Sequence, residues 1–240
     1  PSMLYLLNNN YIPMAGIVIA FKNINLKDGI FNSPWCGFQN FKYLFATKDA
    51  FTITRNTILY NIAFIILGTA FAILLAILLS ELKNRVCSKF YQTVILFPYL
   101  VSMIIVSYLA YAFLSEKTGF LNNSILPLFG ADPVAWYSQT KYWPFLLVFI
   151  YLWKSSGYSC IIYLSSIMGI DPAYYEAAAL DGASIWQRIR LITIPLIKPT
   201  ILMMMILSVG KIFYSDFGLF YQVPQNSGPL YPVTNVIDTY

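Results

Sequence analysis

The chain has 240 residues, of which 58% are hydrophobic and only 10% are charged. A soluble domain usually has about 25% charged and about 45–50% apolar residues, so this composition is typical of a membrane protein. The net charge of +5 does not indicate nucleic-acid binding, because the basic residues are scattered between apolar runs and form no stripe. Histidine is absent, which removes the commonest general base and metal ligand. No disulfide or metal site is predicted from Cys36, Cys87 and Cys160.

Five apolar stretches are long enough, or nearly so, to cross a bilayer, which takes roughly 20 residues. They are about Met3–Phe21, Thr57–Ser80, Phe90–Leu114, Trp143–Gly169 and Ile197–Tyr221. Lipid offers the backbone no hydrogen-bond partners, so we expect helices and not open strands. Pro98 should kink the third of them.

The connecting segments 22–56, 81–89, 115–142 and 170–196 are polar, and we expect the tail 222–240 to be a loop. The short loop 81–89 carries Lys83, Arg85 and Lys89, as expected of a cytoplasmic loop. Over the whole chain, however, Lys and Arg are nearly balanced between the two sides. Charge alone therefore does not predict the orientation.

The segment 170–196 contains an Ala-rich stretch with strong helix signals at both ends. Asp171 is a good N-cap, and Pro172 suits the first helical position. Ala177–Leu180 have high helix propensity, and Gly182 can adopt the left-handed conformation that ends a helix. We expect a second short helix over 184–193, stopped by Pro195. The segment is thus predicted to be a helix–turn–helix outside the membrane.

This segment resembles the EAA motif of ABC importer permeases, which reads E-A-A, three residues, G, nine residues, then I-x-L-P. Ile194 stands where the motif usually has Leu. The resemblance implies a cytoplasmic coupling helix that docks into a cleft of a partner ATPase. The coupling residues it implies are Glu176, Ala177, Ala178, Asp181, Gly182, Ala183, Ile192 and Pro195.

Three further segments resemble the maltose-type carbohydrate permeases, and within them the branch for complex oligosaccharides. They are Trp35-Cys36-Gly37-Phe38-Gln39-Asn40-Phe41 (W-x-G-x-x-N-[FY]), Gly119 with Asn122 (G-x-x-N), and Trp153-Lys154 with Gly157 (W-K-x-x-G). Such permeases usually have six spans. With five visible, we expect a sixth to be missing after residues 236–240, which look like the approach to it.

The resemblance implies an all-α, polytopic transmembrane helical bundle. Residues 1–240 would form one transmembrane domain, incomplete at one or both ends, with 170–196 as its cytoplasmic coupling loop. The implied function is that of a permease in the bacterial cell membrane, importing a carbohydrate, expected to be an oligosaccharide, by alternating access. The implied partners are a second permease, a cytoplasmic ATPase dimer and an extracellular solute-binding protein. ATP and Mg²⁺ would bind to the ATPase, since no phosphate-binding G-x-x-x-x-G-K-[ST] loop is present here.

Ionisable residues within spans are costly and indicate function. On the fourth span Tyr151, Lys154, Ser155 and Tyr158 recur at helical spacing. The fifth span shows the same spacing for Lys211, Tyr214, Ser215, Gly218 and Tyr221. Since aromatic rings pack on sugar rings, we expect a substrate pathway lined by Tyr151, Lys154, Tyr158, Lys211 and Tyr214.

Alternatives to this substrate pathway remain open. The tyrosines could be interfacial anchors, and Lys154 could instead pair with a backbone carbonyl or with Asp216. A permease for a non-sugar solute, a membrane-embedded enzyme and a structural scaffold are the competing functions. An enzyme would need clustered carboxylates or metal ligands, whereas the ten acidic residues are spread along the chain. A scaffold would leave the spaced motif unexplained.

Overall fold

The computed structural model describes residues 2–25, 29–46, 48–82 and 84–240, so Lys83 of the basic loop lies outside the described residues. Within these ranges the chain is helical, with a single isolated bridge between Lys22 and Trp35 and no strand. It forms two compact units, Pro1–Thr52 and Ile53–Tyr240. That residues 1–240 act as one transmembrane domain stays a prediction.

The first unit begins with a nearly continuous helix over Ser2–Phe21, which is long and apolar enough to cross a membrane. It comprises α1 (Ser2–Leu6), η1 (Leu7–Tyr11), α2 (Ile12–Met14) and η2 (Ala15–Phe21). Beyond it, the expected loop contains two more helices, α3 (Gly29–Asn32) and α4 (Gln39–Ala46).

The W-x-G-x-x-N-[FY] segment closes the end of this first helix. The amide Nδ2 of Asn40 donates to the carbonyl oxygens of Ala20 and Lys22, at 2.9 and 3.0 Å. The rings of Phe21, Phe38 and Phe41 pack together with centroids 5.4–5.8 Å apart. The segment therefore satisfies carbonyls that the helix end would otherwise leave without donors.

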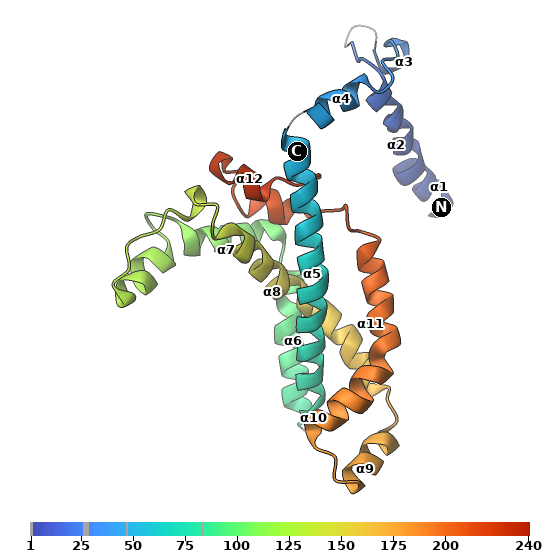
Figure 1. Ribbon diagram of the computed structural model, residues 1–240, viewed down its shortest axis with the longest axis vertical. Helices are drawn as coiled ribbons and strands as arrows, with labels where there is room; N and C mark the ends of the chain where they lie inside the picture. Colours follow the sequence, from blue (N-terminus) through green and yellow to red (C-terminus); the bar gives the residue numbers. More distant parts are fainter. Residues whose placement is uncertain (1, 26–28, 47, 83) are drawn as a thin grey trace. The chain divides into compact units, whose positions relative to one another are not determined.

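The second unit is built around long helices (Figure 1). They are α5 (Lys48–Ser80), α6 (Arg85–Leu100), α7 (Met103–Leu114), α8 (Trp143–Met168), and a run of α10 (Ile185–Arg188), η6 (Ile189–Thr193) and α11 (Ile194–Val209). In the described part of the whole chain, four helical segments could span a membrane, or five if the bent pair α6–α7 is one span. The α5–α6 turn lies at the same end of this unit as α9 (Pro172–Leu180) (Figure 1), as the sequence predicted.

The third predicted span is not one kinked helix. Helices α6 and α7 meet at 95°. The break comes three residues after Pro98, where Val101 is extended and the Ser102 hydroxyl accepts from the backbone N–H of Ile105 as the N-cap of α7. The second span also begins earlier than predicted, at Lys48 instead of Thr57.

Two predictions for the fifth span are wrong. Pro195 does not stop a short helix, because the π turn η6 precedes it and places this proline in the first turn of α11, so that helix runs on from Ile185 to Val209. The span also ends at Val209 and not at Tyr221. Asn61 Nδ2 on α5 donates to the carbonyls of Ile212 (2.9 Å) and Tyr214 (3.1 Å), which takes these carbonyls out of any helix.

The tail is also more ordered than a loop. It contains η7 (Gly218–Gln222), which starts just before it, and η8 (Gly228–Leu230) and α12 (Tyr231–Thr234). Polar side chains of α5 hold it: Asn56 donates to the carbonyls of Pro232 and Asn235, and Tyr60 donates to that of Val233. Leu230 and Val236 are fully buried in the core that includes Trp143 and Leu147 of α8.

The loop 115–142 is organised by its G-x-x-N element. A Cβ on Gly119 would lie 2.2 Å from the carbonyl oxygen of Ser115, so only glycine fits there. The buried amide of Asn122 donates to the carbonyls of Glu116 and Val134, and its oxygen accepts from Trp136 Nε1. The loop folds as η3 (Leu121–Ile125), η4 (Leu126–Phe129) and η5 (Trp136–Ser138).

Helices α6 and α8 cross in close backbone contact at Gly157, the glycine of the W-K-x-x-G element. A Cβ at this position would lie 2.1 Å from the carbonyl oxygen of Ile95 and 3.1 Å from Cα of Leu96. A side chain here would force the two helices apart, and small residues at such crossings are typical of membrane bundles.

We expect Gly157→Ala to destabilise the protein by about 1–3 kcal/mol, the usual cost of overpacking. The matched control is Gly169→Ala at the end of α8, where the nearest neighbour of a new Cβ would be the Ser166 carbonyl oxygen at an ordinary 3.5 Å. Thermal unfolding of both variants in mild detergent measures the difference. Equal unfolding temperatures for the two variants would contradict the close crossing.

Candidate functional site

Helix α9 has the caps that the sequence predicted. Asp171 Oδ1 accepts from the backbone N–H of Ala173 at 2.9 Å. At the other end Gly182 has φ +76°, and the N–H groups of Ala183 and Gly182 donate to the carbonyls of Ala178 and Ala179, at 2.9 and 3.1 Å. This pair of bonds is a Schellman motif, which explains why the EAA pattern has glycine at this spacing.

A second set of contacts holds α9 against the helix that follows. The hydroxyl groups of Tyr175 and Thr193 lie 3.0 Å apart, and Thr193 is buried. Ser184 and Gln187 form a capping box that starts α10. The coupling loop is therefore a rigid element attached directly to the base of the fifth span.

The outer surface of this loop carries large apolar side chains. Leu180 is 90% exposed and Trp186 is 78% exposed, and they lie on either side of the Gly182 turn. Of the predicted coupling residues, the exposed ones are Glu176, Ala177, Asp181, Gly182 and Pro195, and the half-buried ones are Ala178, Ala183 and Ile192. The sequence interpretation did not include Leu180 and Trp186, because they are not part of the motif.

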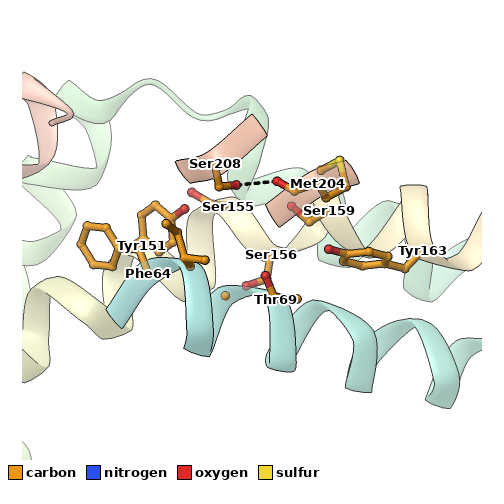
Figure 2. A pocket seen from close by; sticks show the side chains of 11 residues that line it. Phe64, Thr69, Tyr151, Ser155, Ser156, Ser159, Tyr163, Met204 and Ser208 are labelled. Atoms are coloured by element: carbon orange, nitrogen blue, oxygen red, sulfur yellow. Dashed lines mark hydrogen bonds between the residues drawn. The ribbon is translucent and has the colours of Figure 1, made fainter. Parts of the chain in front are cut away.

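A polar pocket lies between α5, α8 and α11, with a volume of about 380 Å³ (Figure 2). Its hydroxyl-bearing residues are Thr69, Tyr151, Ser155, Ser156, Ser159, Tyr163 and Ser208. The Ser208 hydroxyl donates to the carbonyl of Met204 at 2.9 Å (Figure 2). The hydroxyl of Ser156 is buried without a hydrogen-bond partner in the described part of the chain. Small hydroxyl residues on three spans thus converge on one apolar-walled space.

The predicted stripe on α8 divides between two environments. Tyr151 and Ser155 line this pocket, and Tyr151 stacks on Phe64 of α5 with ring centroids 3.9 Å apart and planes at 10°. Tyr158 instead stacks on Tyr99 of α6, at 5.0 Å and 16°. Sequence spacing placed these residues on one face but could not show that two different helices pack against it.

Lys154 binds backbone carbonyls, which is one of the two structural alternatives left open by the sequence. Its Nζ donates to the carbonyl oxygens of Pro98 (3.4 Å), Tyr99 (3.3 Å) and Val101. Asp216 has a different role, since its Oδ1 accepts from the backbone N–H of Leu219 in η7.

Lys211 and Tyr214 border a separate hollow of about 800 Å³, together with Gly210, Phe213 and Asp238. The predicted helical stripe from Lys211 to Tyr221 does not exist, because α11 ends at Val209 and both residues lie in the turn that follows. No group of three or more metal-ligating side chains occurs among the described residues. The three cysteines are free, as expected.

The sequence of residues 68–215 matches the family model of the binding-protein-dependent transport system inner membrane component. The chain belongs to this family. Members are the permease subunits of ABC importers, so the protein is a transport subunit of the inner membrane and not an enzyme. The resemblance drawn from the EAA pattern is thereby confirmed.

Two relatives from Bacillus subtilis (strain 168) align over the whole permease and 74% of their own length. They are Protein LplB, 32% identical, and the polygalacturonan/rhamnogalacturonan transport system permease protein YteP, 33% identical. A crystal structure of a bacterial ABC transporter that imports the acidic polysaccharide alginate contains a chain with 33% identity and a TM-score of 0.90. The match covers all of the permease and 79% of that chain, which confirms the all-α membrane fold.

We expect Tyr175→Phe to loosen the coupling loop, because it leaves the buried Thr193 hydroxyl without its partner. The loss of about 1 kcal/mol should speed amide exchange in 172–183 roughly fivefold. Tyr174→Phe on the same helix is the control, since that side chain is exposed. Hydrogen–deuterium exchange measured by mass spectrometry tests this, and equal exchange in both variants would refute the attachment.

Proposed function

We propose that this permease imports an oligosaccharide, delivered by a solute-binding protein and driven by a cytoplasmic ATPase. The printed names of its relatives carry the proposal: polygalacturonan and rhamnogalacturonan for YteP, galactooligosaccharides for GanP, and alginate for the structural neighbour. A second crystal structure of the alginate transporter holds a periplasmic protein with a bound alginate pentasaccharide. Relatives aligned over the full permease thus handle sugar polymers.

The coupling loop supplies the second step of the proposal. Exposed Leu180 and Trp186 give an apolar surface on a rigid loop outside the membrane spans. Tryptophan is enriched among the residues that dominate binding energy at protein interfaces. We therefore assign the ATPase contact to this loop, with Glu176, Ala177 and Asp181 on the exposed part of the motif.

The substrate pathway is the third step. We assign it to Tyr151 and Tyr158 on α8 and to Lys211 and Tyr214 in the turn after α11. Stacked tyrosines offer flat apolar faces to sugar rings, and the hydroxyls of the polar pocket are suited to binding sugar hydroxyls. A permease for a non-sugar solute is the alternative, and the uptake assay below separates the two.

Gly182 provides the test of ATPase coupling. A β-branched residue is strained at φ +76°, so Gly182→Val should distort the Schellman turn and weaken ATPase co-purification roughly tenfold. The control is Gly182→Asn, because asparagine tolerates this conformation. Open space surrounds the position, so a steric clash with the rest of the chain cannot explain a difference. Full co-purification of the ATPase with Gly182→Val would refute the docking assignment.

The pathway residues are tested by uptake into proteoliposomes that contain the complete transporter. We expect Tyr158→Ala and Lys211→Ala each to raise the KM for a radiolabelled oligosaccharide roughly three- to tenfold, as the loss of one contact of about 1 kcal/mol predicts. The control is Tyr108→Ala on α7, an exposed tyrosine that lines none of these spaces. If both variants keep the wild-type KM, the pathway assignment fails.

A further inference from the structure

An ammonium group lies at the point where a membrane helix breaks. The carbonyls of Pro98, Tyr99 and Val101, at the end of α6, converge on Nζ of Lys154, which comes from a different helix. The last carbonyls of a helix have no partners within the helix, and lipid supplies none. The negative end of the helix dipole adds to the attraction for a cation.

The three hydrogen-bond donors of this ammonium are all in use. A lysine side chain has three N–H donors and no acceptor. Three backbone carbonyls accept from it, so none is left for a hydroxyl or carboxylate of a substrate. This arrangement separates Lys154 from the substrate contacts that its position within a span suggested.

The same break carries one half of an aromatic pair. Tyr99, whose carbonyl accepts from Lys154, stacks on Tyr158, one helical turn further along α8. The two rings remain 45% and 48% exposed, so the pair presents aromatic surface and not a closed core. Gly157 lets the two helix backbones approach each other at this level.

We propose that Lys154 is a positioning residue: it fixes the break between α6 and α7 and thereby holds the Tyr99 ring against Tyr158, forming an aromatic platform for a sugar ring. The role of the platform in transport rests on the proposed function, whereas the positioning by Lys154 does not. Tyr99 thus joins the pathway as a residue that no helical periodicity on α8 could reveal.

Thiol cross-linking measures the positioning directly. Tyr99→Cys and Tyr158→Cys are combined in a full transporter whose native cysteines are replaced (Cys36→Ser, Cys87→Ser, Cys160→Ala). The rate of bridging by a short bis-maleimide is compared with Lys154 intact, in Lys154→Met and in Lys154→Arg. We expect Lys154→Met to slow bridging roughly fivefold or more, as the loss of at least one charged hydrogen bond predicts, and Lys154→Arg to restore it. Unchanged bridging in Lys154→Met would overturn the proposal.

Uptake of a neutral and of an acidic oligosaccharide by proteins with both tyrosines intact distinguishes positioning from charge recognition. Positioning predicts that Lys154→Met slows both by the same factor and that Lys154→Arg rescues both. A loss confined to the acidic sugar would show a substrate contact and would overturn the proposal. If Lys154→Met does not assemble, the same comparisons are made with Lys154→Gln. If the wild type carries neither sugar, the proposed function fails, while the cross-linking rates still decide the role of Lys154.

Discussion

Each carbonyl exposed by a helix break inside a bilayer needs a donor, because lipid provides none. In this permease the donors come from side chains on unbroken helices. Lys154 on α8 receives the end of α6, and Asn61 on α5 receives the turn after α11. The intact helices α5 and α8 therefore determine where their neighbours end and in which direction the chain continues.

Helix α5 has the same role for the tail. Asn56 and Tyr60 donate to carbonyls of the last 10 residues, and the Thr57 hydroxyl accepts from the N–H of Ile237. These polar residues lie at the start of an otherwise apolar helix. A hydropathy profile detects the span, whereas the hydrogen-bonding function of its first two turns is visible only once the tail is placed beside it.

The continuous helix from Ile185 to Val209 links the two parts of the proposed mechanism. Its first turn belongs to the coupling loop, and near its other end Ser208 lines the polar pocket. The Tyr175–Thr193 contact attaches α9 to the same helix. A displacement of the loop by the ATPase would thus act on the pocket wall through one rigid element, which the predicted stop at Pro195 would have interrupted.

The sequence by itself determined the coupling helix and its caps, because the groups involved lie within a few residues of one another. Asp171 bonds two residues along the chain, and the Gly182 turn closes onto the helix it ends. Hydropathy likewise sufficed for the approximate positions of the membrane helices. Only the tertiary structure decided where α6 and α11 end, since the donors lie far away in sequence: Lys154 is 56 residues from Pro98, and Asn61 is 151 residues from Ile212. Local propensity carries no information about partners at such distances.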